Sequence, residues 1–358
     1  MTVLKVLSRK DRITLAAGVI CSVATGILHF AGLNAVVTFV IALLALAALA
    51  ALVGQATEQV GTRLGPGATG VLQSGLGNLP ELFVSLFALR AGLVEVVQAT
   101  IIGSILGNSL LVLGLAFLVG GLRHGAQRFA SEAPRIVAIL TVLAVAALAV
   151  PTMAHGLHVP ASAHIEGISI ASAIVLLIVF AGSVPFSLKA GGLALEAAPE
   201  DEAGAAWPLW LAAALLAVAG VGAAFISDWF IAALEPAIEA LHLSQAFTGL
   251  VIVAIAGNAV ENVVGIQLAA ANKPDYAISV ILNSSLQVAL FLTPALVLLS
   301  LVVGGAYLTL VMPPMLVVAV GLAALLGALI VFDGESTWLE GMALLGLYAI
   351  LAASFWWG

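Results

Sequence analysis

Charge is scarce in this chain: Asp, Glu, Lys and Arg make up 8% of its 358 residues, whereas 63% are hydrophobic. Soluble domains average about 25% charged residues, so this scarcity excludes an ordinary soluble domain. The apolar runs are also too long and too continuous for the alternating strands of about ten residues that build a membrane barrel. The composition therefore predicts an all-α polytopic membrane protein embedded in a lipid bilayer.

Cysteine and excess positive charge are lacking too. The single cysteine, Cys21, has no partner for an internal disulfide and is interpreted as a small apolar helix residue. A net charge of −7 gives no indication of a nucleic-acid partner. The apolar runs hold no paired aspartates and no Ser/His pair, so we expect neither an enzyme nor a resident cofactor.

The apolar runs of spanning length can be laid out as about eleven transmembrane helices. They lie near residues 13–31, 34–54, 69–90, 94–120, 134–151, 165–187, 207–226, 247–271, 275–303, 306–331 and 338–357. With a cytoplasmic N-terminus, ten of the eleven Lys and Arg residues fall on the cytoplasmic side and only Arg90 falls outside. This distribution favours eleven spans over ten or twelve, and an external C-terminus.

The chain divides at an acidic linker, residues 189–206, that is rich in Gly and Ala. We expect one extra N-terminal helix in 1–33, a first five-helix repeat in 34–188, and a second in 207–358. Since five is odd, the second repeat has inverted topology, an arrangement in which transporters place their site at mid-membrane on the repeat interface. Two loops are expected outside, Pro151–His164 and Ser227–Ala246. The first contains His155, His158 and His164, and their loose spacing favours a solvated loop over a zinc site.

One pentapeptide pattern occurs twice within the apolar runs, as Gly77–Glu81 and as Gly257–Glu261. Each copy ends in a glutamate, so Glu81 and Glu261 hold equivalent places in the two halves of the chain. An acidic residue at mid-helix costs roughly 2.5–3.5 kcal/mol on insertion scales, so intramembrane carboxylates usually serve a function. We therefore interpret the pair as two halves of one cation site.

Each glutamate has matching polar companions. Asn78 and Asn258 lie one helical turn before the glutamates, and Ser104 and Ser284 follow them in the next span, each at the same distance from its glutamate. The same helices supply the other candidate cation- or proton-binding residues: Gly77, Gly257, Gln98, Asn108 and Gln287. Glycine and Pro80 near the first motif indicate a break that would expose backbone carbonyl oxygens to a cation.

These groups offer only oxygen ligands, which suit a hard cation such as Ca²⁺, with Glu81 and Glu261 as the metal carboxylates. The alternative is that these small and polar residues pack membrane helices together. This alternative applies most to Ser104, Ser109, Ser285 and Gly107. Glu58, Glu95 and Glu166 lie near span ends, where solvation or helix capping explains them.

The motifs resemble those of the Ca²⁺/H⁺ antiporters of the calcium/cation antiporter superfamily. The resemblance rests on Gly77-Asn78-x-x-Glu81 with Gly103–Asn108 in the first half, and on Gly257–Glu261 with Ser284-x-x-Gln287 in the second. It implies a Ca²⁺ site on the two glutamates, protons that compete there, and a prokaryotic plasma-membrane location. The resemblance also makes the acidic residues of the linker candidates for cytoplasmic Ca²⁺ sensing. The alternative is that the linker only keeps this region soluble. These residues are Glu196, Glu200, Asp201 and Glu202.

Three positions depart from the family pattern: Pro80 is more typical of the sodium/calcium branch, Asn262 stands where proton-coupled members usually have histidine, and Asn283 stands where glycine is usual. We expect secondary Ca²⁺/H⁺ antiport by alternating access. The alternatives are Na⁺/Ca²⁺ exchange and, more remotely, a passive cation channel. The sequence leaves stoichiometry, selectivity and oligomeric state open, a homo-oligomer included.

Overall fold

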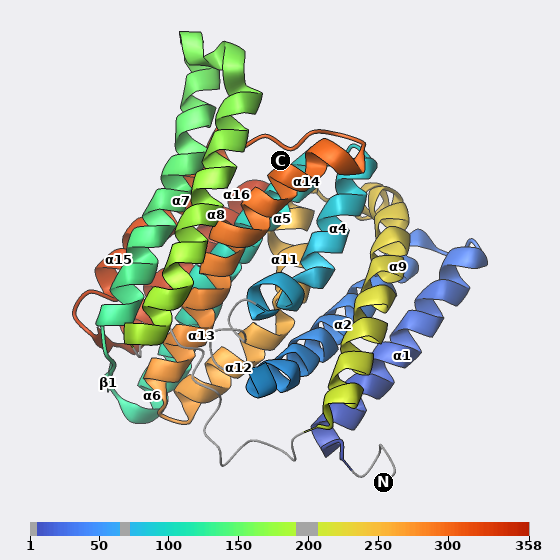
Figure 1. The fold of residues 1–358 in the computed structure, drawn as a ribbon, viewed down its shortest axis with the longest axis horizontal. Coiled ribbons are helices and arrows are strands. Elements are labelled where there is room, and N and C mark those ends of the chain that lie inside the picture. The colour runs from blue at the N-terminus through green and yellow to red at the C-terminus, as the bar shows by residue number, and fades with distance from the viewer. Residues whose placement is uncertain (1–5, 65–71, 191–206, 358) are drawn as a thin grey trace.

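The computed structural model describes residues 6–64, 72–190 and 207–357, and these residues are almost entirely helical (Figure 1). Eight helices are long and apolar enough to cross a membrane, or nine if one bent pair counts as a single span, within the described ranges. This confirms the all-α polytopic class. The expected count of eleven spans stays a prediction.

Six elements are single uninterrupted long helices. They are α1 (Arg9–Phe30), α2 (Ala35–Leu64), α7 (Glu132–Gly156), α8 (Ile165–Ala190), α9 (Leu209–Leu241) and α16 (Trp338–Trp356). The first and last begin with capping boxes, in which Ser8 and Thr337 accept from backbone N–H groups three residues later and Asp11 and Glu340 accept in return. A capping box satisfies two of the free amides at a helix start, so these helix boundaries follow from local sequence.

The remaining spans are interrupted by π-helical turns. The first half holds η2 (Gln73–Gly77) with α4 (Leu79–Arg90), and α5 (Val94–Leu106), η3 (Gly107–Val112) and α6 (Leu113–His124). The second half holds α10 (Gln245–Phe247), η6 (Thr248–Val253), α11 (Ala254–Gly257) and α12 (Ala259–Ala270), then α13 (Pro274–Gln287), η7 (Val288–Leu292) and α14 (Thr293–Val303). The starts of α4 and α12, of α5 and α13, and of α6 and α14 are separated along the chain by the same offset as the two glutamates.

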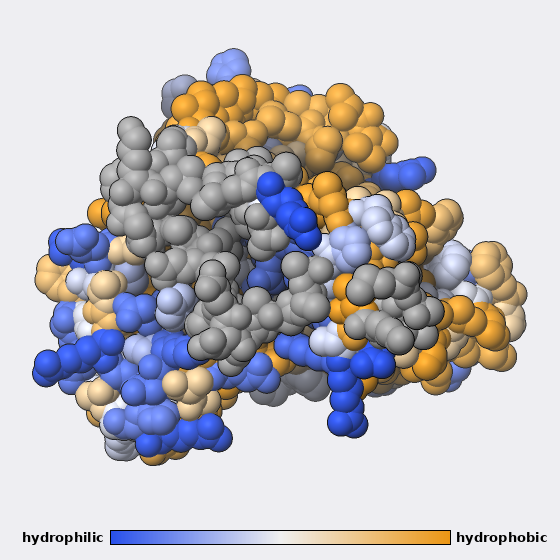
Figure 2. Space-filling view, turned by 60° about the horizontal axis from the view of Figure 1, so that its bottom comes forward, coloured by the Kyte–Doolittle hydropathy of each residue, from blue (hydrophilic) through white to orange (hydrophobic). Residues whose placement is uncertain are grey.

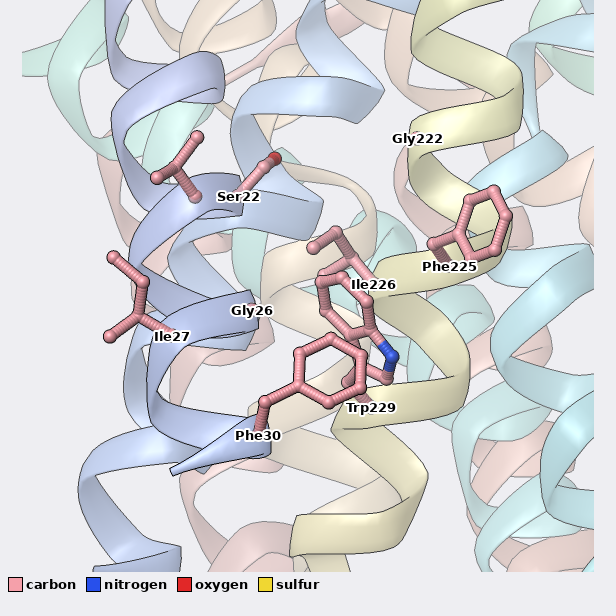
Figure 3. A pocket seen from close by; sticks show the side chains of 9 residues that line it. Ser22, Gly26, Ile27, Phe30, Gly222, Phe225, Ile226 and Trp229 are labelled. Carbon is pink, nitrogen blue, oxygen red and sulfur yellow. The ribbon is translucent and has the colours of Figure 1, made fainter. Parts of the chain in front are cut away.

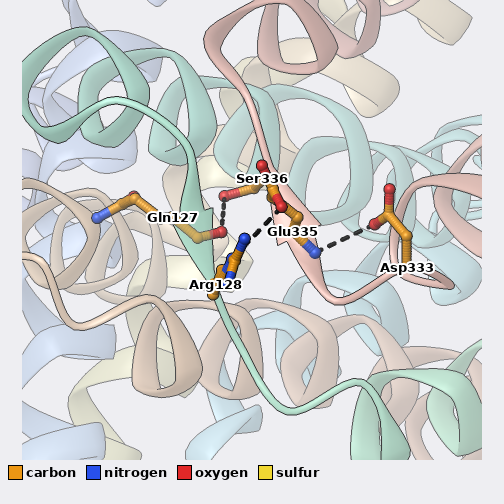
Figure 4. Close-up of polar contacts among 5 residues, drawn as sticks. All are labelled: Gln127, Arg128, Asp333, Glu335 and Ser336. Carbon is orange, nitrogen blue, oxygen red and sulfur yellow. Dashed lines mark hydrogen bonds and ion pairs between the residues drawn. The ribbon is translucent and has the colours of Figure 1, made fainter.

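A shorter apolar helix, α15 (Pro314–Ile330), packs against α7. The remaining elements are short: η4 (Pro160–His164), β1 (Gln127–Arg128) and β2 (Glu335–Ser336). The two strands pair antiparallel, with Gln127 opposite Ser336 and Arg128 opposite Glu335. Arg128 Nε lies 3.5 Å from a Glu335 carboxylate oxygen, and Ser336 Oγ donates to the Gln127 carbonyl at 3.4 Å (Figure 4). This sheet joins the α6–α7 connection to the α15–α16 connection.

Three predicted boundaries are wrong. The expected external loop 227–246 is mostly helix, because α9 continues through Pro236 to Leu241. Similarly α7 continues through Pro151 to Gly156, and η4 follows it. The span expected to start at 306 begins instead at Pro314, because Gly304 and Gly305 adopt positive φ and the segment 306–313 runs without helix to the Pro313–Pro314 pair. Prolines inside α7 and α9 show how packing overrides a local helix-breaking signal.

The helices fall into two groups in space. α1, α2 and α9 lie side by side at the right of Figure 1, with α2 packed along both of the others. An apolar pocket of about 540 Å³ lies between α1 and α9, lined by Gly26, Phe30 and Trp229 among others (Figure 3). The other helices form the larger group, and α4 and α12 contact both groups. The end of the molecule at the bottom of Figure 1 carries many hydrophilic residues, with hydrophobic residues at its sides (Figure 2).

Candidate cation site

The first glutamate motif forms a helix break. The π-helical turn η2 ends at Gly77, and Asn78 has non-helical angles (φ −94°, ψ 19°) before α4 starts at Leu79. Pro80 fits in the first turn because the missing N–H would have no intrahelical partner there. Glu81 therefore lies in the first turn of α4, where the free amides and the helix dipole favour a negative charge.

The second motif repeats this geometry. Asn258 has φ −95° and ψ 24°, α12 starts at the next residue, and Glu261 lies in its first turn. The helices on the two sides of this break are bent by 64°. The sequence predicted a broken backbone at the first pentapeptide, and the structure has such a break at both.

The carboxylate of the first motif reaches the backbone of the second motif. Glu81 is only 5% exposed, and its Oε1 lies 2.8 Å from the position that a Cβ on Gly257 would take. Its Oε2 is buried and has no hydrogen-bond partner. Glu261 is half-buried. No ion pair with Lys or Arg reaches either glutamate within the described chain. The first half thus places a buried carboxylate, without a neutralising partner among the described residues, against the motif that carries the second glutamate.

An amide–hydroxyl network lies beside these two motifs. Asn108 Nδ2 donates to Asn258 Oδ1 at 3.0 Å and to Ser284 Oγ at 2.9 Å. Asn258 Nδ2 donates in turn to Ser104 Oγ at 3.0 Å. All four side chains are buried, and Asn108 Oδ1 has no donor. The network connects α5 and η3 of the first half to α12 and α13 of the second, and it leaves one buried oxygen free to bind a cation.

Other polar residues of the motifs are also brought together. Asn78 Nδ2 lies 3.5 Å from Gln287 Oε1, which joins the first break to α13. Ser109 and Ser285, each interpreted as a candidate for helix joining, hydrogen-bond to one another at 3.0 Å. Because this bond links η3 to α13, it agrees with the interpretation that the two serines join membrane helices.

Two candidate residues do not join the cluster. Gln98 Nε2 donates to the Val311 carbonyl at 2.7 Å and so holds the extended segment before α15. Gly77 faces no carboxylate, since the nearest atom to an added Cβ is Gln73 Cγ at 3.6 Å. The four acidic linker residues, Glu196, Glu200, Asp201 and Glu202, lie outside the described residues.

Several charged or metal-binding candidates stay away from the site. His155, His158 and His164 make no metal-type cluster with one another or with acidic residues in the part of the chain that the structure describes. Glu95 and Glu166 are exposed, as expected for residues near span ends.

The sequence reasoning missed two hydroxyls near the site. Ser85 and Thr100 are buried, and neither hydroxyl has a hydrogen-bond partner. The signal was available for Ser85, because it lies one helical turn after Glu81 and so shares its helix face. Thr100 lies one helical turn before Ser104 and so shares the helix face of that residue.

The chain matches the family model described as sodium/calcium exchanger protein over residues 34–189 and 211–357. The chain belongs to this family. It is 36% identical to a protein of Synechocystis named Ca(2+)/H(+) antiporter, over 98% of both chains, and 34% identical to the Ca(2+)/H(+) antiporter ChaA of Bacillus subtilis, over 96% of this chain and 97% of that one. It is accordingly an integral membrane protein of an ion-exchanger family.

Two solved structures have a similar fold. Native YfkE superposes with a TM-score of 0.81 at 33% identity and covers 96% of this chain and 98% of its own. The H⁺/Ca²⁺ exchanger CAX superposes with a TM-score of 0.75 at 16% identity, over 97% of this chain and 92% of its own, which is a similarity of fold alone.

Proposed function

We propose that this protein is a secondary transporter that exchanges Ca²⁺ for H⁺ by alternating access. The observation that carries the proposal is the buried Glu81 carboxylate, which lies against Gly257 of the motif that carries Glu261, with no basic partner for either glutamate among the described residues. Its relatives in Synechocystis and Bacillus subtilis, both named Ca(2+)/H(+) antiporters, support H⁺ as the coupling ion.

The ligand set suits Ca²⁺. This ion takes six to eight oxygen ligands in flexible geometry, and two carboxylates balance its charge. Glu81 Oε2 and Asn108 Oδ1 are buried acceptors without a donor, so a cation would satisfy both. Around them, Asn78, Asn258, Ser104, Ser284 and Gln287 complete the polar shell, while Gly257 leaves the space in which the Glu81 carboxylate lies. Gln98 and Gly77, which do not join this cluster, are not included in the proposed shell.

The coupling follows from charge. Two ionised carboxylates in a water-poor interior repel one another, so the empty charged site is unfavourable. Either one Ca²⁺ or protons on the carboxylates remove the repulsion, and the same oxygens do not hold both at once. A conformational change that exposes the site to the other side of the membrane is therefore favourable only when the site is loaded, and this links the two fluxes.

The inverted-repeat division supports alternating access. We infer an extra helix in 1–33, repeats in 34–188 and 207–358, and a linker in 189–206 between them. The constant offset of α4–α6 from α12–α14, with the same break at Asn78 and Asn258, is the supporting observation. Sodium coupling is the alternative, since Asn262 replaces a titratable residue beside Glu261.

The test uses purified protein in vesicles that contain a pH-sensitive dye. Adding Ca²⁺ outside is expected to move protons in the opposite direction, and either Glu81→Gln or Glu261→Gln is expected to abolish the movement. Glu166→Gln is the matched control, because Glu166 is exposed at the start of α8. Ca²⁺ uptake that needs Na⁺ and leaves the pH unchanged would identify Na⁺, and not H⁺, as the coupling ion. A conductive Ca²⁺ flux that is not coupled to another ion would indicate a channel.

A further inference from the structure

Ser85 is a buried hydroxyl without a partner. It lies on α4 one turn beyond Glu81, is 2% exposed, and its Oγ makes no hydrogen bond. Side chains on a helix lean toward its N-terminus, so the Ser85 hydroxyl leans toward the turn that carries Glu81.

Five buried serine and threonine hydroxyls on the described helices have no partner, those of Ser22, Thr57, Ser85, Thr100 and Ser227. Of these, only Ser85 and Thr100 lie on the site helices α4 and α5. Thr25, Thr141 and Thr152 each donate to the carbonyl oxygen one turn earlier, at 2.8, 2.8 and 2.7 Å. Such a bond is the ordinary way to satisfy a hydroxyl in an apolar helix. Ser85 lacks this bond and therefore bears the cost of a buried polar group that water no longer solvates.

Thr100 has the same property on the neighbouring helix. It is 3% exposed, its Oγ1 has no partner, and it lies on α5 one turn before Ser104. Because α4 and α5 are joined by the short turn 91–93, both hydroxyls are displaced from the site toward that turn. We call this the α4–α5 end of the site.

The second half lacks this pair. The equivalent positions there are Gly265 and Val280, and the side-chain space beside Gly265 is filled by Ile281, whose Cγ1 lies 2.6 Å from an added Cβ. At these two positions the α12–α13 end of the site therefore has no hydroxyl, whereas the α4–α5 end has one at each.

The α4–α5 end is also closed by backbone packing. A Cβ on Gly249 of η6 would lie 2.6 Å from the Val96 carbonyl oxygen and 3.0 Å from the Thr100 amide nitrogen of α5. Gly103 of α5 similarly contacts the Leu250 backbone. In contrast, Glu261 is half-buried where Glu81 is fully buried, so the site is more accessible from the half that carries Glu261.

We propose that Ser85 and Thr100 line the passage from the site to the α4–α5 end, and that they bind water and the passing ions in the conformation in which α5 and η6 separate. This inference rests on the proposed exchange by alternating access. In the conformation described here the two hydroxyls lose their hydration, so they destabilise it relative to the opened one. They thus favour opening at the end that the α5–η6 contact closes.

Charged groups near α4 do not substitute for the two hydroxyls. Glu81 is the ionisable residue on the same face, one turn away. Arg90 and Asp228 line a separate apolar cleft between α4 and α9, together with Phe83 and Phe87. Glu95 on α5 is exposed.

The test compares stability with transport. Ser85→Ala and Thr100→Val remove the unsatisfied hydroxyls, so each is expected to raise the melting temperature by about 2 °C. The maximal exchange rate is expected to fall several-fold, while the half-saturating Ca²⁺ concentration is unchanged when Ca²⁺ is added at the α12–α13 end. The matched control is Thr141→Val, which removes a hydroxyl that already has a hydrogen bond. This substitution should lower the melting temperature and should not combine higher stability with slower exchange.

A second measurement tests the passage directly. In a Cys21→Ser background, which removes the chain's single cysteine, Ser85→Cys is expected to react with a membrane-impermeant thiol reagent from the α4–α5 side. The reaction should be several-fold faster during exchange than at rest.

Lower stability of Ser85→Ala and Thr100→Val, or no reaction of Ser85→Cys while exchange proceeds, would overturn the inference alone. If the unmodified protein shows no Ca²⁺-driven proton movement, the proposed function fails instead.

Discussion

At the scale of the residue, the two pentapeptides are alike in sequence but different in environment. Gly257 provides space for the Glu81 carboxylate, whereas Gly77, its counterpart in the first motif, contacts no carboxylate. Glu81 is buried and Glu261 is half-buried. The structure thus describes one asymmetric arrangement of two related motifs, as expected of a transporter in a conformation with unequal access to its two sides.

This asymmetry predicts different effects of two equivalent substitutions. Gly257→Ala places a methyl group 2.8 Å from Glu81 Oε1 and is expected to raise the half-saturating Ca²⁺ concentration roughly tenfold, or about 1.4 kcal/mol. The melting temperature should change little, because the end of a flexible side chain is what moves. Gly77→Ala is the control. Equal losses of Ca²⁺ affinity in the two variants, measured by Ca²⁺-dependent flux, would contradict the arrangement.

At the scale of the element, the close crossing of α5 and η6 holds the first and second halves together. Gly103 and Gly249 allow backbone contact there, and the polar network of Ser104 with Asn258 follows at the next position on α5. The equivalent of Gly103 in the second half is Asn283, which is buried and donates to Ser279 at 3.2 Å. The departure from glycine noted in the sequence therefore corresponds to a helix position filled by a hydrogen-bonded amide.

The crossing predicts a strong effect of Gly103→Ala. The added methyl group meets the Leu250 backbone, which does not yield easily, so we expect destabilisation of roughly 1–3 kcal/mol and a melting temperature lower by several degrees. Gly54→Ala on α2 is the matched control, since nothing lies within 4 Å of its added Cβ and alanine favours helix. Thermal unfolding in detergent measures both, and an equal response would refute the role of the crossing.

At the scale of the whole molecule, the distribution of basic residues predicts how the protein is oriented in the membrane. The connections expected on the cytoplasmic side lie at one end of the bundle, where β1 and β2 pair and Ala130 N donates to Asp275 at 2.7 Å. The segment 304–313 covers the opposite end, with Leu310 N donating to Ser169 and Met312 N to Thr152, both at 3.0 Å. The α4–α5 turn, and with it Arg90, belongs to this second end, because Ala306 N donates to the Leu89 carbonyl.

Thiol labelling in intact cells tests this orientation. In the Cys21→Ser background, Trp357→Cys is expected to react with an impermeant maleimide added outside, since Trp357 is exposed at the end of α16. Lys10→Cys, near the start of α1, is expected to react only after the membrane is made permeable. Labelling of Lys10→Cys in intact cells would reverse the orientation and the expected direction of transport.

The sequence by itself determined the class of the protein and predicted the centre of its site. Continuous apolar runs dictate membrane helices, because a bilayer requires every backbone hydrogen bond to be made within the segment. The costly carboxylates Glu81 and Glu261, with Asn78 and Asn258 in register, indicated the cation site for the same energetic reason. Local patterns carry this information, and so they were readable without a fold.

Only the tertiary structure decided which residues meet. It assigned Gln98 to the Val311 carbonyl, continued α9 through Pro236, and left Ser85 and Thr100 without partners. It also closed the α4–α5 end by the contact of Gly249 with Val96 and Thr100. Some of these features depend on contacts between segments far apart in the sequence, and others depend on hydrogen bonds that a side chain fails to make. Residue spacing along a single helix predicts neither kind of feature.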